Sequence, residues 1–235
     1  MDRTKLSPSV YDSSPTSSER IDFKWGTSSV MGPGRAYSRL KRSFDLAILI
    51  FLLPVILMAV LIIAAVIKID TKGPVFFSQA RVGFEGKTFI MIKFRTMVTE
   101  NPNHNTKEHI ASYMTMDNDT RVTRVGRFLR RYRFDEIPQV LNIFKGEMSW
   151  VGPRPEAEPL SFWYGLQIPL YGCRHMVRPG ITGWAQVNQG HVINVSEVAE
   201  KLNYDLYYIK HASLWLDFKI AIRTLRTLII GNGAR

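Results

Sequence analysis

The sequence is poor in the residue types that build disulfides and zinc sites. Among its 235 residues there is a single cysteine, Cys173, which excludes an intramolecular disulfide and is typical of a reducing compartment. Its five histidines show no close ligand spacing. The sequence therefore argues against both a disulfide-stabilised fold and a zinc centre.

A secretory signal is also missing near the N-terminus. The first residues are rich in serine, proline and threonine and have few large apolar side chains, a composition that cannot bury a core. Residues 1–38 are therefore predicted to form a disordered tail. The rest of the chain is long enough for one sizeable domain, or for a domain with a membrane anchor.

Acidic residues are scarce, and one stretch has none. Lysine and arginine number 31 against 20 aspartates and glutamates, a net charge of +11, so we expect anionic partners such as nucleic acid, lipid headgroups or phosphorylated substrates. Residues 121–133 contain six arginines and no acid, and then Asp135 and Glu136 arrive together. Guanidinium groups match phosphate oxygens, and a carboxylate among them is held ionised, ready to act as a nucleophile or a metal ligand.

One long apolar run predicts a membrane element. Residues 46–67 are uncharged and almost wholly apolar over 22 residues, and about 20 are needed to cross a bilayer. Length alone favours a simple spanning helix. However, Pro54 bends or breaks a helix inside the run, and both flanks are basic, which keeps both on the cytoplasmic side. We therefore expect a re-entrant helix–break–helix over residues 39–70, broken at Pro54.

Residues 71–235 are expected to form a cytosolic domain that begins with a β-hairpin. Residues 75–77 and 89–94 read as strands joined around residues 83–87. Lys93 and Arg95 share one face of the second strand. They form either a phosphate contact or a solvated edge.

The acidic pair is predicted to lie at a helix start. Pro138 is tolerated only near the beginning of a helix, and a stripe with helical spacing follows, which we expect to be buried. Asp135 then points away from that core, in the first turn, where free backbone N–H groups favour anions. The stripe consists of Ile137, Leu141, Phe144 and Met148.

Three further segments carry signals. Arg154 lies between two prolines, which fix its backbone and would suit a phosphate clamp. Arg178 opens a turn-rich segment that includes a tryptophan. Residues 213–230 predict an amphipathic helix with Ser213 as its N-cap, either lying among lipid headgroups or packing on the domain core. Its apolar residues are Leu214, Phe218, Ala221, Leu225 and Leu228.

Taken together, these segments resemble the bacterial sugar transferases that initiate exopolysaccharide assembly, the monotopic phosphoglycosyl transferases. The resemblance covers about residues 39–230 and is specific, because several long motifs occur in one order. The motifs are KRSFD (41–45), GPVFFSQARVG (73–83), KFRTM (93–97), TRVGRFLRRYRFDEIPQVLNIFKGEMSWVGPRPE (123–156) and RPGITGWAQV (178–187).

The resemblance implies a reaction. A sugar-1-phosphate, with glucose or galactose as the better guess, would pass from a UDP-sugar to undecaprenyl phosphate, releasing UMP, with Mg²⁺ as cofactor. Asp135 would form a covalent phospho-sugar intermediate, and Glu136 would bind Mg²⁺ with it or orient it. Lys93, Arg95, Arg130 and Arg154 would hold phosphates, and Arg178 would contact the nucleotide.

The sequence-level expectation is thus an α+β protein. It has a re-entrant membrane helix, a mostly helical cytosolic domain with a small β-hairpin, and interfacial amphipathic helices, at the cytosolic face of the bacterial inner membrane. The lipid bilayer is an expected partner, nucleic acid is not, and a homodimer is left open. Two alternatives remain: the same reaction with an N-acetylated amino sugar, or a non-catalytic membrane-tethered protein that binds anions.

Overall fold

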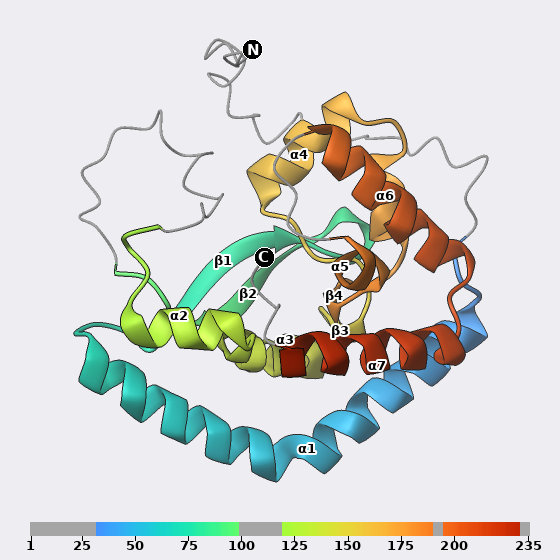
Figure 1. Ribbon diagram of the computed structural model, residues 1–235. Coiled ribbons are helices and arrows are strands. Elements are labelled where there is room, and N and C mark those ends of the chain that lie inside the picture. The colour runs from blue at the N-terminus through green and yellow to red at the C-terminus, as the bar shows by residue number, and fades with distance from the viewer. Residues whose placement is uncertain (1–31, 99–118, 190–194, 231–235) are drawn as a thin grey trace, which may run out of the picture.

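The computed structural model describes residues 32–98, 119–189 and 195–230, so residues 1–31 of the predicted tail (1–38) lie outside it. The last four residues of that predicted tail, 35–38, lie in a helix instead. Helices dominate, and the strands in the described ranges form two small sheets (Figure 1), as the sequence predicted. The α-helices are α1 Arg35–Asp70, α2 Arg124–Arg131, α3 Val140–Lys145, α4 Glu158–Gln167, α5 Trp184–Asn188, α6 Val195–Lys210 and α7 Leu214–Ile230. The 3-10 helices are η2 Phe84–Gly86, η5 Phe134–Gln139 and η6 Tyr171–Met176, and the strands are β1 Phe76–Val82, β2 Thr88–Phe94, β3 Ser149–Val151 and β4 Gly180–Thr182.

Helix α1 is long and apolar enough to cross a membrane. It begins at Arg35 rather than at residue 39, and it is one continuous helix of 36 residues with Pro54 inside. The predicted interruption is therefore a bend and not a break. Figure 1 shows the bend near the middle of α1, with both ends turned toward the rest of the protein. A proline removes one backbone donor and crowds the preceding turn, which bends a helix whose other hydrogen bonds persist.

The predicted hairpin is confirmed. Strands β1 and β2 pair antiparallel, from Phe76 opposite Phe94 to Val82 opposite Thr88. The connection η2 uses positive φ at Glu85 (56°) and Gly86 (72°), which reverses the chain tightly. Side chains alternate along β2, so Phe89 and Met91 are buried together with Leu49 of α1 and with apolar residues of α3.

A second, parallel sheet joins β3 to β4, with Ser149 opposite Gly180 and Val151 opposite Thr182. The strands come so close that a Cβ added to Gly180 would collide with the backbone of Gly152. Glycine is needed there for the close approach. This pairing places the proline-framed segment around Arg154 beside the loop that starts at Arg178.

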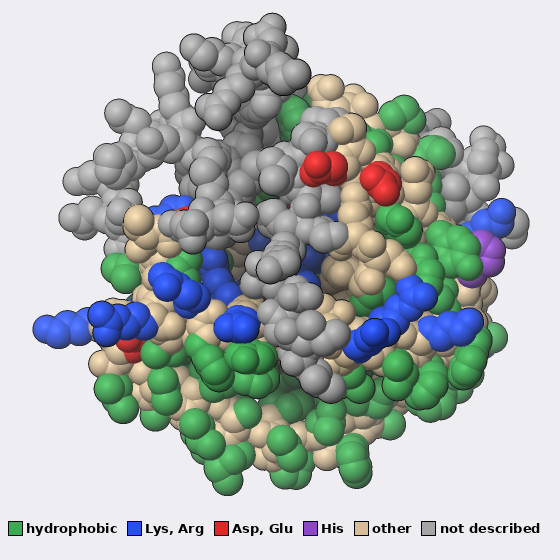
Figure 2. Space-filling model, in the orientation of Figure 1, with side chains coloured by type: hydrophobic (Ala, Val, Ile, Leu, Met, Phe, Trp, Pro, Cys, Tyr) green, Lys and Arg blue, Asp and Glu red, His purple; other side chains and the backbone are tan. Residues whose placement is uncertain are grey.

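The lower face of the protein is apolar and exposed. Figure 2 shows hydrophobic side chains over this face, with a band of lysines and arginines above them. The predicted buried stripe was largely wrong here, because Leu141 and Phe144 are 49% and 65% exposed and only Met148 is fully buried. Helix α3 instead buries Val140 and Ile143.

The predicted C-terminal helix is present as α7, and its N-cap is confirmed. The Ser213 hydroxyl accepts a hydrogen bond from the Leu216 backbone N–H at 3.3 Å. Leu216 and Ile220 pack in the core with β3 and α6, whereas Phe218 and Leu225 of the predicted stripe are exposed. The helix therefore packs on the domain with one side and leaves apolar side chains on the other.

Candidate active site

The acidic pair lies at a sharp turn between two helices. Helix α2 is capped by Thr123, whose hydroxyl accepts from the Gly126 backbone N–H at 2.8 Å. After α2, Arg133 adopts a left-handed conformation with φ 56°, which redirects the chain into η5. Phe134 is left exposed, and Asp135 and Glu136 are buried in the first turn of η5. The predicted position of the pair at a helix start is confirmed, although the first turn is 3-10 and runs directly into α3.

Glu136 is the anchor of the cluster. Its Oε1 accepts from the Arg154 guanidinium at 2.6 Å and from the Lys93 ammonium at 3.3 Å. Burial alone would raise the pKa of Glu136, but Arg154, Lys93 and Arg133 together outweigh burial and hold the pKa well below its ordinary value. Glu136 is therefore ionised.

Asp135 lies in a different balance of charges. Burial raises its pKa and the neighbouring Glu136 charge adds to that, while Lys93, Arg154 and Arg130 only partly offset the rise. The pKa of Lys93 is in turn lowered, chiefly by burial, although Glu136 opposes the change. In this cluster Asp135 is the carboxyl that holds a proton more readily, and a further cation nearby would favour its ionised form.

Three of the predicted phosphate-binding residues converge on the pair. Lys93 comes from β2, Arg154 from the segment after β3, and Arg130 from the last turn of α2. Arg130 interacts electrostatically with Asp135 and donates from Nε to the Thr96 hydroxyl at 2.9 Å. The cluster thus unites side chains from three separate elements around two carboxylates.

Two predicted residues do not join the cluster. Arg95 donates to the backbone oxygens of Thr71 and Lys72 at 2.9 and 2.8 Å, where it closes the C-terminal end of α1. Arg178 donates to the Gly146 backbone oxygen at 2.8 Å, just after α3. Both arginines bind carbonyl groups at helix ends, so in this structure they support the fold around the site.

A buried ion cluster, which sequence reasoning missed, holds the Arg154 backbone. Arg174 donates to the Arg154 carbonyl at 2.8 Å and pairs with Asp205 at 2.9 Å, with both side chains only 2% exposed. Lys201 pairs with Glu156 at 2.6 Å in the same cluster. The flanking prolines restrict the backbone of Arg154, and this cluster fixes where that backbone lies. No local pattern signals it, because Arg174 is far in the sequence from Glu156 and from α6, which supplies Lys201 and Asp205.

The KRSFD motif connects α1 to the site. The Arg42 guanidinium donates to the backbone oxygens of Ile143 and Phe144, at the end of α3. Asp45 accepts from the Ser149 hydroxyl at 3.0 Å and from the Trp150 backbone N–H at 3.3 Å. The apolar helix is therefore bonded directly to the two elements that follow the acidic pair.

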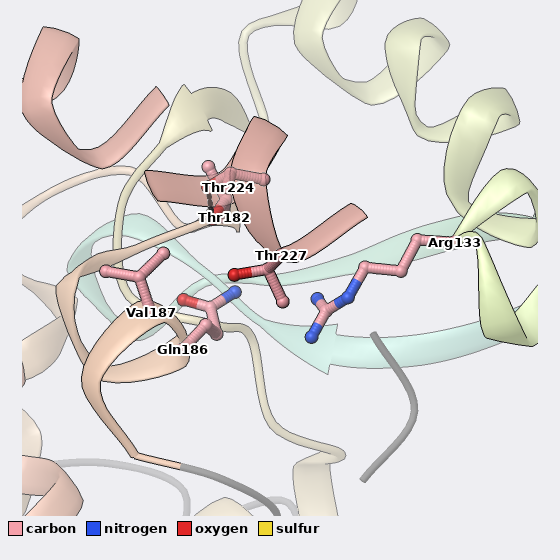
Figure 3. Close-up of a pocket in the computed structure, with 6 residues that line it drawn as sticks. All are labelled: Arg133, Thr182, Gln186, Val187, Thr224 and Thr227. Atoms are coloured by element: carbon pink, nitrogen blue, oxygen red, sulfur yellow. Dashed lines mark hydrogen bonds between the residues drawn. The ribbon is translucent and has the colours of Figure 1, made fainter. Parts of the chain in front are cut away.

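A small cavity adjoins the site (Figure 3). Arg133 points into it from the turn before Asp135, and its other lining residues come from β4, α5 and α7. The volume open to the centre of a water molecule is about 10 Å³, room for roughly one water. Besides Arg133, the lining consists of Thr182, Gln186, Val187, Thr224 and Thr227, with Thr182 and Thr224 hydrogen-bonded at 2.7 Å.

The acidic pair is chemically suited to a divalent cation. The second carboxylate oxygen of Glu136, Oε2, is buried without a hydrogen-bond partner among the described residues. Carboxylate oxygens are preferred Mg²⁺ ligands, and Mg²⁺ usually takes one or two of them with water and substrate phosphates. The described ranges contain no group of three or more His, Cys, Asp or Glu residues placed to hold a metal. Asp135 and Glu136 are therefore the residues that would hold a Mg²⁺ ion here, as one or two carboxylate ligands.

Comparisons with known proteins confirm the resemblance. Residues 36–231 match the family model "Bacterial sugar transferase". The chain is 42% identical over 203 residues to the UDP-N-acetylgalactosamine-undecaprenyl-phosphate N-acetylgalactosaminephosphotransferase of Aeromonas hydrophila, covering 86% of this chain and 47% of that one. It is 41% identical over 189 residues to the UDP-glucose:undecaprenyl-phosphate glucose-1-phosphate transferase of Escherichia coli K12, covering 79% and 39%.

The UDP-glucose:undecaprenyl-phosphate glucose-1-phosphate transferase of Caulobacter vibrioides is 38% identical over 196 residues, covering 83% of this chain and 71% of that one. The chain spans less than half the length of the Aeromonas and Escherichia proteins. The match to the family model nevertheless extends over nearly all of the described residues. The chain belongs to the bacterial sugar transferase family.

Proposed function

We propose that the protein transfers a sugar-1-phosphate from a UDP-sugar to undecaprenyl phosphate and releases UMP. The observation that carries the proposal is the buried Asp135–Glu136 pair, with Glu136 held by Lys93 and Arg154 and with Arg130 beside Asp135. Fixed cations around a carboxylate suit phosphoryl chemistry, in which positioning and charge neutralisation supply most of the catalysis. The relatives from Aeromonas and Escherichia are named for transfers of this kind to undecaprenyl phosphate.

In the first step, a carboxylate oxygen of Asp135 attacks the phosphorus that carries the sugar. A bond forms between that oxygen and phosphorus, the phosphoanhydride bond to UMP breaks, and UMP leaves with the electron pair. Arg154, Arg130 and Lys93 neutralise the charge on the phosphoryl oxygens. The product is a phospho-sugar bound covalently to Asp135.

In the second step, a phosphate oxygen of undecaprenyl phosphate attacks the same phosphorus. The bond to Asp135 breaks and returns a free carboxylate, and the lipid leaves as a diphosphate-linked sugar. Glu136 stays ionised throughout because Arg154 and Lys93 hold it. It keeps Asp135 oriented for both steps and retains one carboxylate oxygen for a cation.

Mg²⁺ is the proposed cofactor, held by Asp135 and Glu136. When bound, it supplies positive charge that stabilises the diphosphate and the leaving UMP. The unpartnered Oε2 of Glu136 and the raised pKa of Asp135 support this assignment, because both are relieved by a cation beside the pair.

The proposed location is the cytosolic face of the bacterial inner membrane, with α1 entering and leaving the bilayer on that face. Three features support a re-entrant arrangement: basic flanks at both ends, the bend in α1, and the bonds from Arg42 and Asp45 that tie its N-terminal part to the domain. The exposed apolar face of α1 and the cationic band above it suit acyl chains and headgroups respectively.

The proposed donor is a UDP-hexose, glucose or galactose. Relatives named for glucose support it, while the Aeromonas relative, named for N-acetylgalactosamine, favours the amino-sugar alternative. The test is UMP release from purified protein with undecaprenyl phosphate, Mg²⁺ and a panel of UDP-sugars. Turnover with UDP-glucose or UDP-galactose is expected. If none of the UDP-sugars in the panel supports UMP release, the proposed reaction is refuted. If only N-acetylated donors support it, the amino-sugar alternative is selected.

A further inference from the structure

Three aromatic rings form an exposed cluster immediately before the acidic pair. Phe128 and Tyr132 lie 5.0 Å apart between ring centroids, Tyr132 and Phe134 6.0 Å, and Phe128 and Phe134 6.2 Å. Phe128 and Phe134 are 55% and 41% exposed. We call these three residues the ring cluster. Exposed apolar side chains gathered in one place are candidates for an interaction site.

The backbone turn at Arg133 leaves Phe134 of the ring cluster exposed and the acidic pair buried, although the two are neighbours in the sequence. The left-handed conformation of Arg133 lies between Tyr132 and Phe134. After this turn, Phe134 is exposed and its neighbour Asp135 is buried. The exposed ring of Phe134 and the proposed nucleophile therefore belong to residues joined by a single peptide bond.

The helix that carries Phe128 packs directly on α1. Leu129, next to Phe128 in α2, is buried against Ile67 of α1, and Val60 and Ile63 join the same contact. The same helix carries exposed cations: Arg124, Arg127 and Arg131 are exposed, and the Arg131 guanidinium lies 5.8 Å from the Tyr132 ring centroid. Exposed rings on a helix with exposed cations suit an amphiphile whose head is a phosphate.

We propose that the ring cluster binds the first isoprene units of the polyprenyl phosphate acceptor, an inference that rests on the proposed function. The phosphate of this lipid must reach Asp135, and its first isoprene unit is attached directly to the phosphate oxygen. That unit must therefore lie beside the acidic pair. In a phospholipid, by contrast, glycerol separates the phosphate from the acyl chains.

The chemistry of the polyprenyl chain also favours aromatic rings over other apolar side chains as its binding surface. Each isoprene unit has a flat double bond with a π face and a methyl branch, which stack on an aromatic face with many close contacts. A saturated straight chain has no such face. The ring cluster should therefore distinguish prenyl phosphates from alkyl phosphates and not merely hold the protein at the membrane.

The test compares two double variants of the full chain. Phe128→Leu with Phe134→Leu keeps apolar side chains but removes two rings of the cluster. The matched control, Trp215→Leu with Phe218→Leu, removes another exposed, stacked ring pair, 5.6 Å apart on α7. UMP release is measured in detergent at a saturating concentration of the UDP-sugar that the unmodified protein uses.

The ring-cluster variant is expected to raise the KM for undecaprenyl phosphate about tenfold, equal to about 1.4 kcal/mol, while the control variant leaves it unchanged. The burst of UMP from donor alone is unchanged in both, which also reports intact folding. Farnesyl phosphate should inhibit the unmodified protein better than dodecyl phosphate, and this preference should fall toward unity in the ring-cluster variant.

An unchanged acceptor KM in the ring-cluster variant, or an equal rise in both variants, would overturn the inference. The second result would indicate general lipid anchoring, and loss of self-association at unchanged KM would assign the rings to a second copy of the chain. If the variant does not fold, a photoreactive prenyl phosphate must label residues 128–134 of the unmodified protein, and labelling elsewhere overturns the inference. If the unmodified protein releases no UMP at all, the proposed function fails instead.

Discussion

Replacing Arg154 by methionine should make the stability of the protein depend on pH in a particular way. Arg154 donates to Glu136 at 2.6 Å, and the Glu136 side chain is only 5% exposed. Removing one partner of a buried pair usually costs about 3–5 kcal/mol, because a buried charge is left uncompensated. Arg154 is partly exposed, and the Lys93 ammonium remains 3.3 Å from the Glu136 carboxylate. The variant is therefore expected to lose about 2–3 kcal/mol of unfolding free energy near neutral pH.

The sign of the pH dependence follows from the depressed pKa of Glu136. A carboxylate whose folded pKa lies below its unfolded value stabilises the fold above the unfolded pKa, which is about 4.3 for glutamate. That contribution is lost as the pH falls further toward the folded pKa. In Arg154→Met the pKa of Glu136 rises toward its ordinary value, so ionised Glu136 contributes less to the free energy of unfolding. The difference in unfolding free energy between the variant and the unmodified protein therefore becomes smaller as the pH falls.

The assay is thermal unfolding at one scan rate between pH 7 and pH 3.5, for the unmodified protein and two variants. The Tm loss in Arg154→Met should be greatest at pH 7 and clearly smaller near pH 3.5. Arg178→Met is the matched control, because Arg178 bonds a backbone carbonyl and its effect should not vary with pH. A Tm loss in Arg154→Met that is the same at every pH would refute the ionised pair.

Three further predictions concern the cofactor, the topology and the buried ion cluster. Chelation of divalent cations should abolish UMP release and added Mg²⁺ restore it, with Glu136→Gln needing more Mg²⁺ than the unmodified protein; turnover in excess chelator would contradict the proposed site. Cysteines placed singly in residues 35–42 and 68–72 should all be labelled from the cytoplasmic side, and labelling of the two flanks from opposite sides would show a spanning helix. Arg174→Met should cost about 3–5 kcal/mol of stability, measured by thermal unfolding. Adding Asp205→Leu should restore part of this loss. Equal Tm values for the single variant and the unmodified protein would show that the cluster does not hold the Arg154 segment.

Features with a local cause could be predicted from the sequence. The hairpin, the N-cap at Ser213 and the helix start at the acidic pair all depend on residues close together in the chain. The convergence of Lys93, Arg130 and Arg154 could also be expected, but only through the resemblance to a family. Physical patterning alone indicated phosphate binding without saying which cations would meet.

Other features depend on contacts between distant segments. Spacing gave α3 an apolar stripe at Leu141 and Phe144, but it could not show that this side is exposed beside α1 and that Val140 and Ile143 are buried instead. Arg95 and Arg178 looked like free cations because the helix ends that they bond are set by tertiary structure. Arg174 had no local signal, since its partner Asp205 comes from α6.

The most direct test of the mechanism is covalent labelling by the donor alone. Purified protein is incubated with Mg²⁺ and the UDP-sugar that supports turnover, without a lipid acceptor, and the labelled peptide is sequenced by mass spectrometry. The account predicts one sugar phosphate on Asp135, released when undecaprenyl phosphate is added, and no label in Asp135→Asn. Turnover without a label on Asp135, or a label on Glu136, would contradict it.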